Sequence, residues 1–532
     1  MNEKLYHAQH TADLCVVGGG LAGTIAALAA ARRGAKVVLI QDRPVLGGNA
    51  SSEIRMWVRG AHGVENRETG ILAEIEEENI YRNPNLAAPL WDSVLYGKVM
   101  AEKNITLLLN TSCLDATVGV DGKIQSAAAW QLNTYTFHTV SAKIFADCSG
   151  DSILAPLVGA RYRVGREAEG EYGESLGRAI ADSKTMGSSV LLQSRETDHA
   201  VKFIPPKWAY IYETDADFAK AIRQVTDKNV ISENRDHNVG TSGGNLWWIE
   251  VGGDGDTLRD ADANREDLLR IAFGIWDHIK NRGEHGRANW DLEWVGFLPG
   301  KRESRRYVGA HVLNEKDIRD GGTFGDTVAY GGWPMDDHNP RGFYANSEDD
   351  PPSRLVPTPS PYGIPYRALY SEDVPNLMFA GRNISASHVA LSSTRVMGTC
   401  SLIGQATGTA AALCIERNIL PGGLIPGGLT ELLQQRLMDD GVFLPGFVRH
   451  VSQLTLSARL NVTDAERDIL FNGVERPRPE GGQNFITLAL GRRLVFDFGE
   501  KKLLGTLRIQ FDRDYSRMSV SPNAKMRVFA QR

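Results

Sequence analysis

Gly18, Gly20 and Gly23 stand near the start of the chain in the spacing G-x-G-x-x-G. In this spacing the first glycine permits a tight turn, the second lets the backbone approach a pyrophosphate, and the third lets a helix pack against a strand. The apolar run 14–17 before them predicts a buried strand, and the alanine-rich run 21–33 after them predicts a helix whose first N–H groups could receive phosphates. A chance glycine cluster is the alternative, but it would not explain the matching strand and helix. The pattern therefore predicts a dinucleotide site.

The residues after the next apolar run could hold the sugar of that nucleotide. The run 35–40 predicts a second strand, and folds of this kind usually place an acidic residue at its end to bind ribose hydroxyls. Here that place holds Gln41, followed by Asp42 and Arg43. The Gln41 amide can still hydrogen-bond a hydroxyl without a charge, and Asp42 could take the role if the strand ends one residue later.

A second segment that could hold the same nucleotide runs from residue 376 to 413, more than three hundred residues further along. It ends in a predicted helix rich in small residues, whose positive end would point at the cofactor. Arg395 and the N–H groups of residues 396–399 lie where that helix begins, so they could stabilise negative charge. His388 precedes them and is the first candidate for proton transfer, because imidazole titrates near neutrality. The alternative is a histidine that only hydrogen-bonds the fold.

Two further polar clusters could contact a substrate. Arg302, Arg305 and Arg306 fall within five residues, and their guanidinium groups could clamp a carboxylate or sugar hydroxyls. A solvated basic strand edge would explain them equally well. The second cluster is Asp336-Asp337-His338 (336–338), in a stretch rich in proline. One histidine with two neighbouring carboxylates rarely converges on a metal ion, so we predict no metal site and expect His338 to bind substrate or to act as an acid or base.

Six segments together resemble the FAD-dependent oxidoreductase family that is related to the fumarate reductase and succinate dehydrogenase flavoproteins. They are D-L-C-V-V-G-G-G-L-A-G (13–23), Q-D-R-P-V-L-G-G-N-A-S-S-E-I-R (41–55), D-C-S-G-D (147–151), G-K-R-E-S-R-R (300–306), M-F-A-G-R-N-I-S-A-S-H (378–388) and S-S-T-R-V-M-G-T-C-S-L-I-G-Q-A-T-G (392–408). The resemblance implies FAD as the cofactor, with the pair Gly47–Gly48 beside the pyrophosphate and ribityl chain and the pair Gly150–Asp151 near the adenine side. The family's substrates are mostly unassigned, so the resemblance implies a cofactor rather than a particular reaction.

Motifs and resemblance together give a set of expected FAD contacts. They are Gly18, Gly20, Leu21, Ala22, Gly23, Gln41, Asp42, Arg43, Gly47, Gly48, Asn49, Ala50, Ser51, Arg55, Gly150, Asp151, Gly381, Arg382, Val396, Met397 and Thr399. The expected catalytic groups are His388, Arg395, His338, Arg302 and Arg305.

The order of these elements predicts an α/β protein. We expect a Rossmann-like FAD-binding domain, with three layers around a mostly parallel sheet, an inserted α+β cap domain and a C-terminal β-sandwich-like segment. The expected boundaries are 1–159 and 361–420 for the two parts of the FAD-binding domain, 160–360 for the cap, 421–450 for a linker and helix, and 451–532 for a β-rich, discoidin-like segment.

Composition limits the classes of partner. The net charge of −6 argues against nucleic acid, and no stretch approaches the ~20 apolar residues of a membrane span. The N-terminus carries no apolar run that would mark a signal peptide, so we expect a cytoplasmic protein. The five cysteines are isolated, which argues against a disulfide framework or a metal cluster. The expected partner is a small-molecule substrate, and a homo-oligomer stays open.

Three functions fit these features. The first is a flavin dehydrogenase that passes hydride from a small hydroxylated substrate, such as a sugar or glycoside, to flavin N5. The second is a fumarate-reductase-like enzyme acting on a C–C double bond of a carboxylic acid, for which the arginine cluster would be essential. The third is a non-catalytic or RNA-modification-associated flavoprotein, against which the acidic charge balance argues.

Overall fold

The computed structural model describes residues 5–214, 217, 244–282, 285–345, 353–476 and 484–509. Its largest sheet has the strand order β3-β2-β1-β6-β5-β4, and a further strand, β17, pairs with β6 beyond the end of β5. These strands are β1 (Tyr6–Val17), β2 (Val37–Ile40), β3 (Ile105–Leu108), β4 (Thr111–Val118), β5 (Ile124–Gln131), β6 (Thr136–Asp147) and β17 (Leu377–Phe379). Parallel pairing joins β1, β2, β3, β6 and β17, as expected for a Rossmann-like sheet. The strands β4, β5 and β6 form an antiparallel meander.

Two helices from opposite ends of the chain pack against each other beside this sheet. They are α1 (Leu21–Arg32) and α10 (Met397–Arg417), and both are buried over most of their length. A Cβ atom on Gly404 would lie 2.2 Å from the carbonyl oxygen of Ala22, and one on Gly408 would lie 2.1 Å from that of Ala26. The small residues of α10 therefore allow close helix contact, which brings the two distant segments together.

Other helices complete the main hydrophobic core. α2 (Gly70–Arg82) and α3 (Ala88–Met100) pack together, and α11 (Thr430–Asp439) packs on α10. A tight turn around 121–122 joins β4 to β5. The shorter helices near this core are η1 (Gly48–Ala50), α4 (Leu154–Val158), α5 (Glu169–Tyr172), α8 (Glu315–Arg319), η4 (Tyr366–Ala368), α9 (His388–Thr394) and η5 (Pro421–Gly423).

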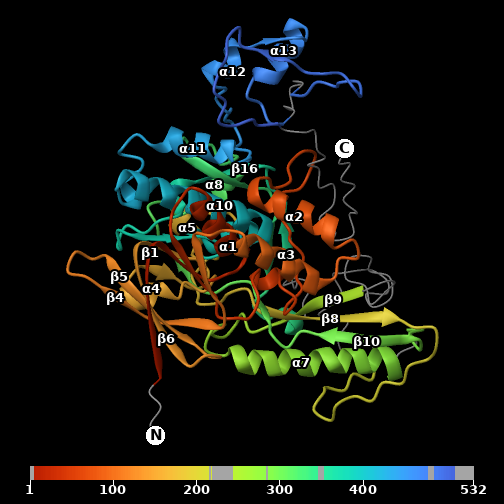
Figure 1. Ribbon diagram of the computed structural model, residues 1–532. Helices are drawn as coiled ribbons and strands as arrows, with labels where there is room; N and C mark the ends of the chain where they lie inside the picture. Colours follow the sequence, from red (N-terminus) through yellow and green to blue (C-terminus); the bar gives the residue numbers. More distant parts are fainter. Residues whose placement is uncertain are drawn as a thin grey trace.

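A second hydrophobic core lies within the inserted part of the chain. Its sheet joins β8 (Ser188–Glu196) to β9 (Gly244–Val251), β10 (Trp290–Val295) and β11 (Gly300–Lys301). Helix α7 (Ala261–Asp277) packs on this sheet and continues as a π-helix, η2 (His278–Arg282) (Figure 1). The second core contains buried side chains between 190 and 343, whereas several between 307 and 330 belong to the main core. The boundaries of a cap at 160–360 stay a prediction.

The described residues also form three short antiparallel strand pairs outside these two sheets. They are β7 (Tyr162–Arg163) with β12 (Arg306–Tyr307), β13 (Thr327–Gly331) with β16 (Tyr362–Pro365), and β14 (Met335–His338) with β15 (Ser353–Val356). The described residues of the proline-rich stretch 334–365 hold three strands and the short helix η3 (Gly342–Tyr344). Among the prolines described there, only Pro365 stands in a paired position, at the end of β16, so the others break no ladder.

The C-terminal segment differs from the expected β-sandwich. In residues 451–476 and 484–509 the structure has α12 (Gln453–Ser457), α13 (Asp464–Phe471) and one pair of two-residue strands, β18 (Arg459–Leu460) with β19 (Phe496–Asp497). A capping box between Thr463 and Glu466 starts α13 and favours helix there. Leu507 and Ile509, which alternate with polar residues in the sequence, are exposed and lie in no strand, and residues 510–532 lie outside the described residues.

One buried arginine connects this segment to the main core through hydrogen bonds and a ring contact. Arg476 donates hydrogen bonds to the backbone oxygens of Glu65 and Arg67 and to the hydroxyl of Tyr330. Its guanidinium also lies 4.3 Å from the ring centre of Phe443. No helix in the described part of the chain is long and apolar enough to cross a bilayer.

Candidate active site

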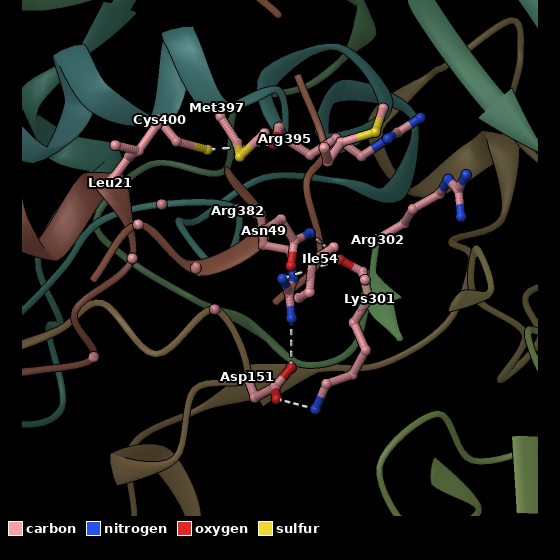
Figure 2. Close-up of a pocket in the computed structure, with 18 of the residues that line it drawn as sticks. Leu21, Asn49, Ile54, Asp151, Lys301, Arg302, Arg382, Arg395, Met397 and Cys400 are labelled. Atoms are coloured by element: carbon pink, nitrogen blue, oxygen red, sulfur yellow. Dashed lines mark hydrogen bonds and ion pairs between the residues drawn. The ribbon is translucent and has the colours of Figure 1, made fainter. Parts of the chain in front are cut away.

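A cavity of about 1430 Å³ extends from the carboxyl ends of β1 and β2 to the sheet of the second core. Ligand pockets usually measure roughly 300–1,000 Å³, so this volume suits a ligand as large as a dinucleotide together with a small substrate. Figure 2 shows residues from both cores pointing into it. The expected FAD contacts that line it are Gly18, Gly20, Leu21, Ala22, Gln41, Asp42, Arg43, Gly47, Gly48, Asn49, Gly150, Asp151, Gly381, Arg382, Val396 and Met397.

Glycines form the narrow floor of the cavity. Gly20 and Gly47 form a β-bridge, and the Gly47 N–H donates to the carbonyl of Gly19 at 2.8 Å. Gly18 has φ of +103°, and a Cβ there would lie 2.5 Å from the Cys148 carbonyl oxygen. A Cβ on Gly20 would meet only the Gly48 Cα, at 3.9 Å. The space above Gly20 is therefore open to a ligand, as the predicted pyrophosphate site requires.

Two helix N-termini lie at this floor, although the Gly398 N–H of α10 donates to the Arg59 carbonyl at 2.6 Å. The N-caps of α1 and α10, Gly20 and Val396, line the cavity and supply no side-chain cap. Helix N-termini without such a cap favour anions, because their N–H groups and the helix dipole both attract negative charge. Among described residues, the buried Nε of Arg382 has no hydrogen-bond partner, while Nη1 of Arg43 and Oε2 of Glu53 lie 3.6 Å apart as an ion pair, and all three residues line the cavity. These polar groups and the glycine floor fit FAD.

The Gln41 side chain does not take the expected role of binding a ribose hydroxyl. Its side chain is buried, its Oε1 accepts from the Gly19 N–H at 2.7 Å, and its Nε2 donates to the Val45 carbonyl at 3.0 Å. It therefore fixes the glycine turn. Asp42 is exposed at the cavity wall, and Glu53 lies 3.6 Å from Arg43. Burial and neighbouring carboxylates outweigh Arg43 and raise the pKa of Glu53. Glu53 was not named as an expected contact from the sequence. Together with Asp42, it is a candidate for binding the ribose hydroxyls.

Asp151 links the two cores at the cavity wall (Figure 2). It forms ion pairs with Lys301 and, at 2.6 Å, with Arg382, and it accepts from Ser304 Oγ at 2.8 Å. Burial alone would raise the pKa of Asp151, but the two cations lower it to about 2. The Lys301 carbonyl in turn accepts from Asn49 and Arg382, so β11 of the second core is fixed against the cofactor floor.

Five expected FAD contacts do not line the cavity. A Cβ on Gly23 would lie 1.9 Å from the Gly18 carbonyl oxygen, so this glycine serves the predicted close packing of turn and helix. Arg55 lies 4.2 Å from the ring centre of Trp294 and bonds Gln193, which turns it toward the second core. The other three are fully or almost fully buried: Ala50, Ser51 and Thr399. The side chains at these positions do not line the cavity, so contact of Ala50, Ser51 or Thr399 with FAD through backbone groups stays a prediction.

A chain of alternating charges forms the wall nearest the second core. Arg302 lies 3.3 Å from Glu250, whose carboxylate is 2.6 Å from His338 Nδ1. His338 Nε2 lies 3.3 Å from Asp336, and Asp336 lies 3.3 Å from Arg395. We call these five residues the charge chain. All except Glu250 line the cavity.

The charge chain sets the protonation of its members. Burial alone would lower the pKa of His338, but the carboxylates of Glu250 and Asp336 raise it above its usual value of 6.5. Burial alone would raise the pKa of Asp336, but His338 and Arg395 hold it well below its usual range. The chain therefore pairs each arginine with a carboxylate and places one titratable imidazole between the two carboxylates.

The arginine cluster 302–306 does not act as one clamp. Arg302 faces the cavity and donates to Ser189 Oγ at 2.7 Å. Arg305 does not line the cavity and lies 5.5 Å from the ring centre of Tyr162, which contradicts its expected catalytic role. Arg306 is buried and ion-paired with Glu167 and Glu303. The three guanidinium groups therefore lie in different surroundings and do not converge on one ligand.

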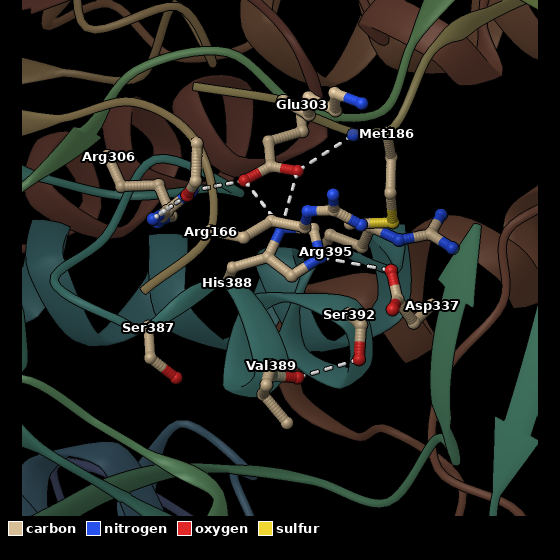
Figure 3. A network of polar contacts seen from close by, with 12 residues as sticks. Arg166, Met186, Glu303, Arg306, Asp337, Ser387, His388, Val389, Ser392 and Arg395 are labelled. Atoms are coloured by element: carbon tan, nitrogen blue, oxygen red, sulfur yellow. Dashed lines mark hydrogen bonds and ion pairs between the residues drawn. The ribbon is translucent and has the colours of Figure 1, made fainter. Parts of the chain in front are cut away.

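His388 lies outside the cavity, in the buried ionic cluster of Figure 3. Its Nδ1 is 2.9 Å from Glu303 and its Nε2 is 2.9 Å from Asp337. Burial alone would lower the pKa of His388, but the two carboxylates raise it to about 10. A doubly paired imidazolium cannot accept a proton near neutrality, so the structure contradicts the expectation that His388 is the base on the reactive side. Its role is to bind the segment before α10 to β14.

Several cavity residues were not named as expected contacts. They include Glu53, Trp57, Arg59, Ser189, Trp294, Phe297, Lys301, Trp333, Leu355 and Cys400, together with Glu250 behind the wall. Glu53, Lys301 and Cys400 stood inside quoted motifs (41–55, 300–306 and 392–408), whereas the others come from strands or loops outside any quoted motif. The described residues hold no cluster of three or more metal-ligating side chains.

Comparison with known proteins agrees with this geometry. Residues 13–437 match the model of a family described as FAD dependent oxidoreductase. No curated protein matches the chain. The family match alone covers well over half of the chain, including both segments that hold the cavity floor.

Solved structures give distant likenesses. A geranylgeranyl bacteriochlorophyll reductase-like protein from Thermoplasma acidophilum is 13% identical over 81% of this chain and 87% of that chain, with a TM-score of 0.34. A variant of the E. coli quinol fumarate reductase FrdA is 11% identical over 81% and 75%, with a TM-score of 0.33. The L-proline dehydrogenase from P. horikoshii is 21% identical over 28% of this chain and 24% of that chain, with a TM-score of 0.18.

Proposed function

This chain belongs to the FAD-dependent oxidoreductase family, and we propose that it oxidises a hydroxyl-bearing small molecule, such as a sugar or glycoside, at the wall formed by the charge chain. The observation that carries this proposal is the pairing of Arg302 and Arg395 with carboxylates. A site for a dicarboxylate needs cationic charge in excess, whereas neutral hydroxyl groups are matched by alternating donors and acceptors. The paired arginines therefore favour a hydroxylated substrate over a carboxylic acid with a C–C double bond.

The cavity residues divide into two groups by the work they would do. The glycine floor, the N-termini of α1 and α10 and the Asp151 cluster would hold FAD. FAD, when bound, supplies the acceptor for a hydride. Trp333 is a further candidate for binding substrate, because it lines the cavity and its buried indole Nε1 has no hydrogen-bond partner among described residues. Arg302 and Arg395 would orient hydroxyl groups through their N–H groups.

His338 is the residue in this wall best suited to take the hydroxyl proton. It lines the cavity, and Glu250 accepts from its Nδ1 side, which would fix the ring and its tautomer. The substrate carbon would lose a hydride to the cofactor while its hydroxyl loses a proton to His338, so that an alcohol becomes a carbonyl. A separate acceptor must then reoxidise the cofactor.

A screen of cofactor reduction tests the proposal. In the absence of oxygen, the purified holoprotein with oxidised cofactor is mixed with monosaccharides, alkyl glycosides or hydroxy acids. In a second set, the cofactor is first reduced with dithionite, and fumarate or a related unsaturated acid is then added. We expect loss of the oxidised flavin absorbance with a hydroxylated compound and no reoxidation by the acids. Reoxidation by an unsaturated acid, with no bleaching by any hydroxylated compound, would instead support a fumarate-reductase-like function.

Arg395 is expected to set the reduction potential of the bound cofactor. The Arg395→Met variant removes a cation beside the N-terminus of α10 and leaves Asp336 without its arginine, and both changes disfavour a negatively charged reduced flavin. We expect the midpoint potential to fall by on the order of tens of mV, measured by dye equilibration with full FAD occupancy.

Two controls separate this effect from general damage. Arg367→Met removes a paired arginine outside the cavity and should leave the potential unchanged. Adding Asp336→Asn to Arg395→Met removes the orphaned carboxylate and should recover part of the fall. An unchanged potential in Arg395→Met would show that this arginine is structural.

A further inference from the structure

The cavity has an apolar wall next to the charge chain. Phe297, Leu298 and Leu355 all line it, and their exposed fractions are 59%, 37% and 55%. Large apolar side chains in a concave site gain free energy when a ligand covers them, because apolar surface is then removed from water. We call these three residues the apolar rim.

Strand pairing places the apolar rim directly beside the proposed reactive groups. In the antiparallel pair β14–β15, Asp336 stands opposite Leu355 and His338 stands opposite Ser353. All four line the cavity, as expected for residues two apart on one face of a strand pair. A ligand that contacts His338 and Asp336 therefore also lies next to the side chain of Leu355.

The other part of the rim comes from the loop between β10 and β11. This loop leads from Trp294 through Phe297 and Leu298 to Lys301 and Arg302. The Gly296 N–H donates to the Leu191 carbonyl at 2.8 Å, and Lys301 is held by Asp151. The loop is thus fixed at both ends, so its apolar side chains are placed by the same strands that place Arg302.

We propose that the substrate is amphiphilic, with a hydroxylated part against the charge chain and an apolar substituent, alkyl or aryl, against the rim of Phe297, Leu298 and Leu355. This inference rests on the proposed function and names the substrate class within it. A free sugar or a short hydroxy acid would leave the apolar rim uncovered, so such compounds are the weaker ligands.

A homologous series of ligands tests the proposal through binding. The oxidised holoprotein is titrated with methyl, butyl, hexyl and octyl glucosides and with 1,2-alkanediols from three to eight carbons, all kept below their micelle concentrations. Flavin absorbance and tryptophan fluorescence report binding, since three tryptophans line the cavity. We expect Kd to fall about threefold per added methylene while the rim is being covered.

Variants identify the surface that is responsible. In Phe297→Ser/Leu355→Ser the dependence of Kd on chain length should disappear, while FAD content and the melting temperature stay near those of the parent because both side chains are exposed. Ile204→Ser removes an exposed apolar side chain outside the cavity and should leave the dependence intact. A Kd independent of chain length in the parent, or the same dependence in the double variant, would overturn the proposal.

The same series separates this inference from the proposed function. Binding that tightens with chain length but never reduces the cofactor would preserve the amphiphilic site and refute oxidation of the hydroxyl group. Cofactor reduction that is equally fast with methyl and octyl ligands would preserve the oxidation and refute the role of the apolar rim.

Discussion

The Gly20→Val variant is expected to fold normally and to be purified colourless, without FAD. In the protein itself a Cβ on Gly20 meets only the Gly48 Cα, at 3.9 Å, so the substitution creates no contact that would prevent folding. Its methyl groups would instead enter the space that the pyrophosphate needs beside the N-terminus of α1. Each displaced hydrogen bond to a charged group is worth about 1.5–3 kcal/mol, so losing two weakens FAD binding by at least a hundredfold.

The measurement is FAD released on denaturation per mole of protein, together with the melting temperature with and without added FAD. The parent should be stabilised by FAD, and Gly20→Val should not be. Gly97→Val is the matched control, because Gly97 lies in α3 and outside the cavity, and a Cβ added there would meet no atom within 4 Å. Full FAD occupancy in Gly20→Val would refute the assignment of the glycine floor.

The cofactor half of the site could be predicted because its physical requirements are local. A tight turn and a close backbone approach need glycine, and the flanking strand and helix are continuous in sequence, so Gly18, Gly20 and the start of α1 were identified directly. Gln41 shows the limit of this reasoning. Its place in the chain was right, but its amide bonds Gly19 and Val45, and only the folded turn reveals that competition for its hydrogen bonds.

The substrate half was less predictable because its residues are brought together by non-local strand pairing. In 336–338 the alternation of a strand sends Asp336 and His338 to the cavity and Asp337 to the opposite face, where it meets His388. In the sequence this stretch stands out for its proline content, so the alternation of a strand was not recognised. Glu250 could not be found at all, since nothing near it in the sequence indicates that its carboxylate contacts His338.

His338 and His388 also differ in their surroundings, and the sequence alone could not show which of them reaches the cavity. His388 has a carboxylate at each ring nitrogen and does not line the cavity, and its pKa is about 10. His338 also lies between carboxylates, but it lines the cavity and adjoins Arg302 through Glu250. Access to a substrate therefore selects His338 for proton transfer.

Replacing His338 with glutamine is expected to slow cofactor reduction by substrate about a hundredfold or more, with FAD binding intact, because general base catalysis commonly contributes that much. The carboxylates of Glu250 and Asp336 raise the pKa of His338 above 6.5, so the proton-accepting form is scarce at low pH. The rate of reduction in the parent should accordingly rise with pH, with its midpoint above 6.5.

Glu250→Gln makes this prediction specific to the charge chain. It removes the carboxylate that does most to raise the pKa of His338, so the midpoint of the pH profile should move to lower pH, while a less well oriented ring lowers the plateau. His338→Gln should lose the inflection altogether, and His7→Gln, which alters an exposed histidine outside the cavity, should keep the parent profile. Stopped-flow measurement of flavin absorbance from pH 5.5 to about 9 covers the range in which an imidazole titrates. If His338→Gln retained both the rate and the inflection, the proton would have to pass to another group, and the charge chain would serve only to bind substrate.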